Sequence, residues 1–287
     1  MKDLLAGRRF LDDAIVESWP RVAPRDLARS IPVSVCWSPI VLCNLQCPHC
    51  LDDKSVGERD KAFRTHIAHL IARARPLGVD ISGGEPLLIP ELPQLLRIVT
   101  NGGIAVGITT NGWFLAERIA ELEGTVDAVR VSLDGPNAKG HDRLRGAGSY
   151  KRALRGLRAA VRQGVPVQVH FVAMASTVDY LQALVDLAAA EGAYGLTVLQ
   201  MLPIGEGTHL AKTEMLDDDE VERIVAELRV PPGLLVRSRA RKDAAGFTVV
   251  RADGSVWRNI VSAQSIRRIR TLTRPEDLRL EGPDGAA

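Results

Sequence analysis

The sequence predicts an α/β fold, a partial (β/α)6 TIM-like barrel. From residue 33 onward, short runs rich in β-branched residues alternate with amphipathic stretches of helical spacing. Such alternation implies parallel strands joined by right-handed crossovers. Six runs are too few to close an eight-stranded barrel, so we expect an open one. The expected strands are residues 33–37, 79–81, 105–109, 128–132, 167–172 and 196–201.

Helices are expected between these strands and after the last of them. The amphipathic stretches lie near residues 58–75, 91–101, 113–122, 149–163, 178–191 and 217–229. The barrel is therefore expected to span residues 33–235. Residues 1–32 carry apolar residues at roughly helical spacing, which predicts an N-terminal helical extension.

A small β-hairpin/helix extension is expected at the C-terminus, over residues 236–287. Residues 247–250 and 255–257 are rich in strand-forming residues and flank the turn Asp253-Gly254, which predicts the hairpin. A basic stretch follows at residues 267–270. The last residues, 281–287, are expected to form a disordered tail.

The composition excludes some classes of partner. Of 287 residues, 37 are Lys or Arg and 35 are Asp or Glu, so the net charge of +2 gives no electrostatic reason to propose nucleic acid. No apolar stretch approaches the length that spans a bilayer, so no membrane partner is expected. Three of the four cysteines lie in one short loop, too clustered for a disulfide framework, which indicates a reducing compartment and a cytoplasmic protein.

Three cysteines after the first strand are the first candidate site. Cys43, Cys47 and Cys50 form a C-x3-C-x2-C run, and thiolates favour iron–sulfur clusters or zinc. A tetrahedral zinc site needs a fourth ligand, but His49 lies too tightly between two cysteines and Cys36 lies in the preceding strand. The spacing therefore favours an iron–sulfur cluster with one open iron. A zinc knot or free buried thiols are the alternatives.

The loop after the second strand carries Gly83-Gly84-Glu85-Pro86. In parallel α/β architectures, ligands gather at the C-terminal ends of the strands. Paired glycines let backbone groups approach a ligand closely, and Glu85 supplies an acceptor for an ammonium group. The plainer alternative is a turn with a helix-entry proline. Because this segment follows the strand that comes next after the three-cysteine loop, the ligand-binding interpretation becomes much more specific.

Further motifs follow the third and fourth strands. Residues 109–112 read Thr-Thr-Asn-Gly, residues 132–136 read Ser-Leu-Asp-Gly-Pro, and residues 141–146 and 149–150 read His-Asp-Arg-Leu-Arg-Gly and Ser-Tyr. From about Ser34 to Gly207 the chain resembles the radical S-adenosylmethionine (radical SAM) superfamily, and the later motifs resemble its branch with a SPASM or twitch extension. The resemblance implies that the three cysteines hold three irons of a [4Fe–4S] cluster. The amino and carboxylate groups of SAM would chelate the fourth iron.

The resemblance also implies which residues contact SAM. The ammonium group would be held by Glu85 and by the backbone of Gly83 and Gly84. Ser132 would contact the ribose or carboxylate end, and Arg145 would pair the carboxylate through a charge-assisted contact. Arg143 is an equally basic alternative two residues away.

Four further residues could either line the cofactor pocket or serve only in a turn or in the hydrophobic core. Asn111 and Asp134 are expected to line the cofactor pocket, with turn formation as the alternative. Val169 and Met201 are expected to pack on adenine, although apolar residues on core strands usually belong to the core.

The mechanism implied by the resemblance is reductive cleavage of SAM. An electron from the cluster would break a carbon–sulfur bond, and the resulting 5′-deoxyadenosyl radical would abstract hydrogen from the substrate. The protein would position the partners and exclude competing reactions. An external one-electron donor, such as a flavodoxin or ferredoxin, is implied.

One feature departs from the SPASM and twitch pattern. Those extensions carry cysteines for auxiliary clusters, and this chain has none after Cys50. Redox-neutral outcomes are therefore favoured over a net two-electron oxidation. Cys36 is a candidate hydrogen-atom donor, with a small buried hydrophobe as the alternative. His170 shares a strand face with Gln168 and is a candidate to contact substrate or take a proton.

The predicted substrate is a ribosomal peptide or another natural product, modified during secondary-metabolite biosynthesis. The alternative within the enzyme class is elimination, decarboxylation or epimerisation of an aminoglycoside, sugar nucleotide or nucleoside. Two other classes remain open: a degenerate, non-catalytic peptide-binding partner and a structural zinc protein. These substrate predictions are analogies from fold and motif.

Overall fold

The computed structural model describes residues 31–52, 54–244, 247–259 and 266–280. The expected N-terminal helical extension lies almost entirely outside these residues, and the expected tail over 281–287 lies wholly outside them.

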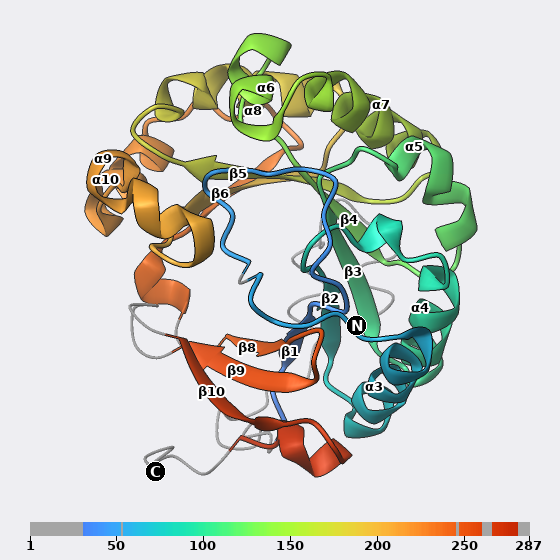
Figure 1. Ribbon diagram of the computed structural model, residues 1–287. Coiled ribbons are helices and arrows are strands. Elements are labelled where there is room, and N and C mark those ends of the chain that lie inside the picture. The colour runs from blue at the N-terminus through green and yellow to red at the C-terminus, as the bar shows by residue number, and fades with distance from the viewer. Residues whose placement is uncertain (1–30, 53, 245–246, 260–265, 281–287) are drawn as a thin grey trace, which may run out of the picture.

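One ten-stranded sheet forms the barrel, and its first six strands are those predicted. They are β1 (Ser34–Trp37), β2 (Gly78–Ile81), β3 (Ala105–Thr110), β4 (Ala128–Ser132), β5 (Val167–Ala173) and β6 (Gly195–Gln200). Neighbours along this series pair in parallel. Every strand end lies within one residue of its expected position, because each of these strands has a distinct β-branched run. The partial-barrel prediction is confirmed (Figure 1).

Four strands extend the sheet beyond the predicted six. A seventh, β7 (Leu235–Arg239), pairs in parallel with β6. On the other side, β8 (Thr248–Val250) pairs in parallel with β1 and forms the predicted hairpin with β9 (Ser255–Asn259). The basic stretch at 267–270 belongs to β10 (Ile266–Thr271), which pairs antiparallel with β9. Both β7 and β10 are edges of this sheet, where charged side chains are common and the apolar run that marks a strand is absent.

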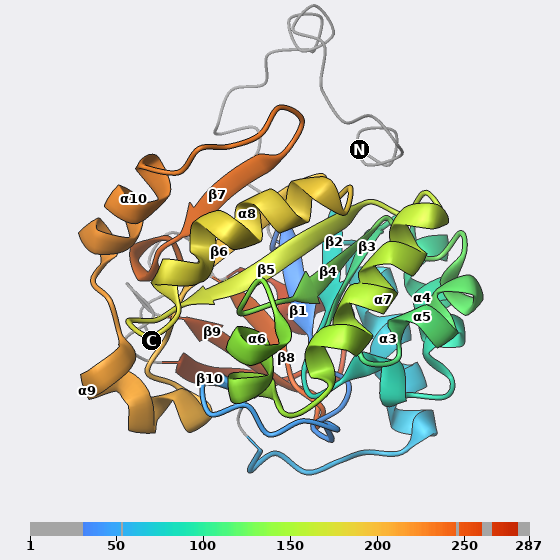
Figure 2. The ribbon, with the colours of Figure 1, turned by 90° about the horizontal axis from the view of Figure 1, so that it is seen from above.

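Helices cover the outside of the barrel (Figures 1 and 2). The longer ones are α3 (Lys61–Ala74), α4 (Leu92–Asn101), α7 (Ser149–Arg162), α8 (Leu181–Ala190) and α10 (Asp218–Ala226). The stretch near 113–122 forms α5 (Leu115–Arg118) and a 3-10 turn at Ile119–Leu122. Two short helices were not expected: α6 (Ala138–Arg145) and α9 (Ala211–Glu214). None of the helices described is both long and apolar enough to cross a membrane.

The two faces of the sheet differ in polarity. Val131 on β4 and Val169 on β5 are fully buried in the main hydrophobic core, with residues of α7 and α8. The alternate residues Ser132 and His170 point into the barrel, and they lie opposite each other in the β4–β5 register. Polar side chains of the strands therefore line the lumen. Val169 belongs to the outer core, which corrects the expectation that its side chain packs on adenine.

Candidate active site

The long loop between β1 and α3 carries the three cysteines across the mouth of the barrel (Figure 1). Cys43, Cys47 and Cys50 are half-buried, and the Cys50 N–H donates to the Cys47 carbonyl at 3.1 Å. Burial raises the pKa of each thiol, that of Cys47 to about 11, and the charge of Cys50 contributes to the rise at Cys43 and Cys47. The thiols therefore lie near one another, and an electropositive metal centre is what would stabilise three thiolates here.

Three thiols in one loop are a donor set that fits a cubane cluster, because each thiolate binds a different iron. Within the described ranges, no group of three or more His, Cys, Asp or Glu side chains is placed to hold one metal ion. The choice between the cluster and the zinc knot stays a prediction from the spacing of the cysteines.

The glycines of the loop after β2 pack directly against the start of the cysteine loop. The Gly84 N–H donates to the Ile40 carbonyl at 2.8 Å, and the Glu85 N–H donates to the Leu42 carbonyl at 3.0 Å. A Cβ atom on Gly84 would lie 2.2 Å from the Leu42 carbonyl oxygen, and Gly83 has a φ of +105°. Only glycines allow this approach. Gly83 and Gly84 therefore position the cysteine loop.

Glu85 is fully buried and bonds to the protein through both carboxylate oxygens. One oxygen accepts from the Leu87 N–H at 3.0 Å and the Thr110 hydroxyl at 2.7 Å, and the other accepts from the Asn111 N–H at 2.9 Å. Burial raises the pKa of Glu85. Glu85 therefore joins the turns after β2 and β3, and its contact with an ammonium group stays a prediction.

Asn111 links the turn after β3 to the first cysteine. Its amide nitrogen donates to the Asn44 side-chain oxygen at 2.9 Å and lies 3.8 Å from the Cys43 sulfur. Its amide oxygen accepts from the Trp113 N–H at 2.9 Å, as a turn residue would. Asn111 is therefore a turn residue that also reaches the cysteine loop, and its place in a cofactor pocket stays a prediction.

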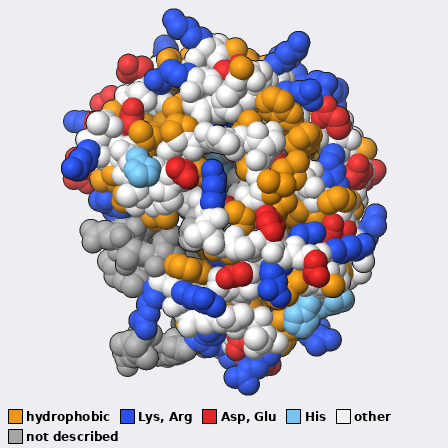
Figure 3. Space-filling view, in the orientation of Figure 1, with side chains coloured by type: hydrophobic (Ala, Val, Ile, Leu, Met, Phe, Trp, Pro, Cys, Tyr) orange, Lys and Arg blue, Asp and Glu red, His pale blue; other side chains and the backbone are white. Residues whose placement is uncertain are grey.

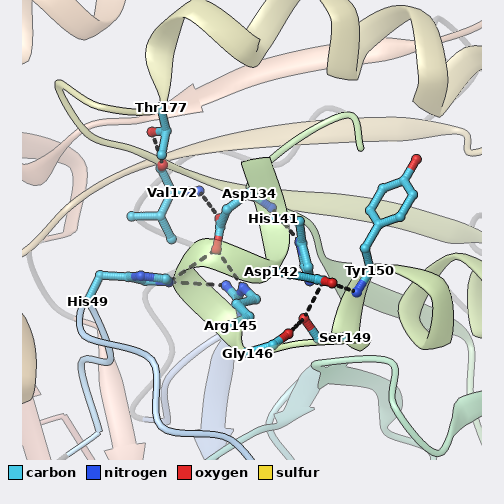
Figure 4. A network of polar contacts seen from close by, with 10 residues as sticks. All are labelled: His49, Asp134, His141, Asp142, Arg145, Gly146, Ser149, Tyr150, Val172 and Thr177. Atoms are coloured by element: carbon cyan, nitrogen blue, oxygen red, sulfur yellow. Dashed lines mark hydrogen bonds and ion pairs between the residues drawn. The ribbon is translucent and has the colours of Figure 1, made fainter. Parts of the chain in front are cut away.

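A buried polar network joins the cysteine loop to the turn after β4 (Figure 4). Asp134 has no exposed surface, and one of its oxygens bonds to Arg145 Nε and lies 3.2 Å from His49 Nε2. The other oxygen accepts from the Val172 N–H on β5 at 3.0 Å. Arg145 Nη2 lies 3.3 Å from His49 Nε2. Asp134 is thus the hub of a contact between His49 and Arg145.

The charges in this network stabilise one another. Burial alone would raise the pKa of Asp134, but Arg145 and then His49 outweigh it and hold that pKa well below its usual range. Burial opposes the charge on Arg145, yet Asp134 and then Cys47 raise its pKa above the usual value. Arg145 therefore stays charged beside the cysteine loop.

The structure distinguishes Arg145 from its neighbour. Arg143 donates from Nη2 to the Ser176 carbonyl at 3.2 Å, outside the network around Asp134. Arg145 is the arginine of α6 that reaches the cysteine loop, through His49. His49 was considered in the sequence only as a zinc ligand. Its position between two cysteines was the available signal that it belongs to the site.

The remaining residues of the α6 motif are structural. The Asp142 carboxylate accepts from the Gly148 N–H, the Ser149 hydroxyl and the Tyr150 N–H at 2.8, 3.0 and 2.7 Å. The His141 ring accepts from the Asp134 N–H at 3.1 Å. These bonds fix α6 relative to α7, and so they fix Arg145.

The other predicted site residues lie at different depths in the barrel. Ser132 and His170 face the lumen, and burial lowers the pKa of His170 well below its usual value, with arginines as the next cause. Met201 is buried just after β6 in a small apolar cluster with Leu144 and Met174. Cys36 is buried on β1, and burial raises the pKa of its thiol to about 12. Its role as hydrogen-atom donor stays a prediction.

Two contacts that the sequence gave no signal for hold the cysteine loop. The Glu58 carboxylate accepts from the N–H groups of Val41 at 2.6 Å and Leu42 at 2.5 Å. Arg251, in the β8–β9 hairpin, forms an ion pair of 2.9 Å with Asp52, two residues after Cys50. Both partners of that ion pair are buried. The C-terminal extension, which lacks cysteines, thus contacts the cysteine loop.

Known proteins are similar to this chain in sequence and in fold. Mycofactocin maturase MftC of Mycobacterium tuberculosis is 33% identical over 187 residues, which is 62% of this chain and 46% of that protein. A probable GTP 3′,8-cyclase of Methanococcus maripaludis is 30% identical over 171 residues, 57% of each chain. The chain spans about half the length of the curated relatives it matches.

The fold is that of a solved peptide-binding relative. Streptococcus suis SuiB, in a crystal structure bound to its precursor peptide SuiA, superposes with a TM-score of 0.69 at 15% identity. The match covers 88% of this chain and 66% of SuiB. The model of the radical SAM superfamily matches residues 37–188, from β1 to α8, including the cysteine loop, the glycine turn and the network around Asp134. The chain therefore belongs to the radical SAM superfamily of enzymes.

Proposed function

We propose that this protein binds a [4Fe–4S] cluster and SAM at the mouth of the barrel and modifies a peptide or another natural-product substrate. The bound pair would supply a one-electron reductive cleavage of SAM and a 5′-deoxyadenosyl radical that abstracts hydrogen from the substrate. The observation that carries the proposal is the network that joins His49 in the cysteine loop to Asp134 and Arg145. It brings a permanent positive charge beside three thiols at the C-terminal ends of the strands.

Each residue of the mouth has a binding or positioning task in this proposal. Cys43, Cys47 and Cys50 hold three irons. Arg145 has five N–H donors, and those not used by Asp134 and His49 are free to bind the carboxylate of SAM. The ammonium group would be held by Glu85 together with the backbone around Gly83 and Gly84.

Lumen residues complete the site. Ser132 on β4 and His170 on β5 are paired in register on the inner surface of the barrel, where they contact the cofactor or the substrate. Met201 packs at the mouth, beside the adenine. An external one-electron donor, a flavodoxin or ferredoxin, would supply the electron to the cluster, and a reducing compartment such as the cytoplasm would keep the thiols available.

A peptide substrate is favoured by two relatives. MftC is a maturase, and the superposed SuiB structure contains a precursor peptide. The second candidate is a nucleotide-like substrate, because a probable GTP 3′,8-cyclase matches over a similar share of the chain. In either case the substrate is selected by the residues of the site rather than by the fold.

Formation of 5′-deoxyadenosine tests the proposed chemistry. The full chain, reconstituted anaerobically with iron and sulfide, is given SAM and a strong reductant beside a variant with Cys43, Cys47 and Cys50 all changed to Ala. We expect the product from the intact chain and none above background from the variant, which also loses bound iron. Equal product from both proteins would contradict the proposal, and so would a complete cluster that never cleaves SAM in the presence of candidate peptides or nucleotides.

A further inference from the structure

Basic side chains of β4 and β7 gather in the barrel lumen. Arg130 lies on the inner face of β4, and its Nη1 forms an ion pair with Asp80 on β2. The second oxygen of Asp80 accepts from the Thr109 hydroxyl at 3.0 Å. Asp80 therefore already has a partner on each oxygen.

Two further arginines reach the lumen from β7, on the open side of the barrel. Arg237 Nε donates to the hydroxyl of Thr197, which is 1% exposed on the inner face of β6, at 3.1 Å. The guanidinium of Arg239 lies 5.3 Å from the centre of the Phe247 ring, just before β8. Among the residues that the structure describes, neither guanidinium has a carboxylate within ion-pair distance. Both side chains are exposed to solvent in the open barrel.

A buried amide oxygen beside these arginines lacks a hydrogen-bond donor in the described residues. Gln168 on β5 is only 4% exposed, and its side-chain oxygen has no hydrogen-bond partner in the described residues. It lies opposite Arg130 in the β4–β5 register. Its amide nitrogen lies 3.4 Å from where a Cβ would be on Gly195 of β6, so the amide extends along the inner face toward β7. A buried acceptor without a donor is costly unless a ligand supplies an N–H or O–H group to it.

The charged and titratable side chains of the lumen interact electrostatically with one another. Burial and then Arg130, Arg239 and Arg237 lower the pKa of His170. Burial and then Arg237 and Arg130 lower the pKa of Arg239, while Asp80 opposes the shift. Three guanidinium groups thus share one region of the described lumen, where Asp80 pairs with one of them. Like charges held this close are unfavourable until an anion joins them.

We propose that Arg130, Arg237 and Arg239 form an anion-binding subsite in the lumen, which takes a carboxylate or phosphate group of the substrate, and that the Gln168 oxygen accepts from an N–H or O–H group of the same substrate. The planar fork of arginine binds both groups in a bidentate manner. Figure 3 views the mouth of the barrel and shows this face hollowed near its centre, with basic and acidic side chains around the hollow. The subsite rests on the proposed function only in assigning the bound anion to the substrate.

Binding of two small probes to the full, reconstituted chain with SAM present tests the subsite. Pyrophosphate represents a phosphate group and glutarate a carboxylate, and isothermal titration gives the affinity of each. We expect at least one probe to bind, about tenfold more weakly in Arg237→Gln or Arg239→Gln and more weakly still in the double variant. Arg155→Gln is the matched control, because Arg155 pairs with Glu117 on the outer surface, and it should keep the wild-type affinity.

The outcomes separate the subsite from the proposed function. The stronger probe identifies the class of anion, and Arg239→Lys should retain more binding than Arg239→Gln because it keeps the charge. Equal binding by all variants would place the anion elsewhere on the surface and overturn the subsite, and so would binding of neither probe. Variants are compared only where circular dichroism shows the wild-type fold. Probe binding that depends on these arginines in a chain that never forms 5′-deoxyadenosine would keep the subsite and reject the proposed function.

Discussion

Asp134 connects three separate segments of the chain. It contacts His49 in the cysteine loop, Arg145 in α6 and the backbone of Val172 on β5. A carboxylate without exposed surface is tolerated because these partners replace its lost water. The same burial makes the site sensitive to the loss of one partner, since the other charge then stays buried and unpaired.

Removal of the Arg145 charge is expected to destabilise the fold as well as weaken cofactor binding. We expect Arg145→Met to lower the free energy of unfolding by about 3–5 kcal/mol, because it leaves Asp134 without its main partner. Arg143→Met is the matched control, since Arg143 bonds only to an exposed loop carbonyl, and we expect a change within about 0.5 kcal/mol. Urea unfolding of the unreconstituted chain measures both. Equal losses would show that Asp134 is not supported by Arg145.

His141 is expected to make stability depend on pH. Burial, and next the charge of Arg145, lowers the pKa of His141 to about 4, whereas an unfolded histidine titrates near 6.5. Between these values the unfolded chain binds more protons, so the free energy of unfolding is at its full value above pH 6.5 and falls as the pH drops toward 4. The expected loss is roughly 2–4 kcal/mol.

An asparagine at this position isolates that contribution. In His141→Asn the side-chain oxygen takes the place of the ring nitrogen that accepts from the Asp134 N–H, and the new side chain does not titrate. We expect the difference in unfolding free energy between wild type and variant to shrink as the pH falls from 6.5 to 4. A difference that stays constant over this range would show that His141 is not held neutral.

At the scale of elements, the sequence predicts those strands and helices that carry a distinct run of hydrophobic residues. The strands β1 to β6 were predicted to within one residue, since each presents an apolar face to the outer helices. Strand β7 was missed because it is an edge strand whose pattern alternates Leu235, Arg237 and Arg239 with less exposed residues. Helix α6 was missed because it is short and polar, and its position depends on bonds from Asp142 to α7.

Close packing of two loops makes Gly84 a sensitive position in the glycine turn. Gly84→Ala would bring a Cβ atom within 2.2 Å of the Leu42 carbonyl oxygen, so the cysteine loop must move. We expect a loss of about 1–3 kcal/mol in unfolding free energy and less iron and sulfide per chain after reconstitution. Gly57→Ala is the control in the same loop, because its Cβ would meet no atom within 4 Å. Normal iron loading in Gly84→Ala would show that the contact does not position the thiols.

At the scale of the whole molecule, the barrel and the C-terminal extension share one sheet. Strand β8 pairs with β1, whose end leads into the cysteine loop, and the β8–β9 hairpin contacts that loop through Arg251. The domain limits at 33–235 and 236–287 stay a proposal. The cysteines, the glycine turn and Arg145 were predictable because each lies in a short motif that can be recognised in the sequence. His49 in the network, Glu58 and the Arg251–Asp52 pair were not, because they depend on how distant segments meet.

The hairpin and the cysteine loop are linked by the ion pair of Arg251 and Asp52. Arg251 and Asp52 are both buried, so Arg251→Met should cost about 3–5 kcal/mol of unfolding free energy by leaving a buried carboxylate with one partner fewer. Because Asp52 follows Cys50 by two residues, we also expect lower iron loading after reconstitution. Arg274→Met is the control in the same extension: its side chain is 73% exposed, and its pair with Asp277 should contribute less than about 1 kcal/mol. If Arg251→Met loses stability but reconstitutes fully, the hairpin supports the fold alone; if iron loading falls with it, the extension without cysteines holds the metal site of the barrel in place.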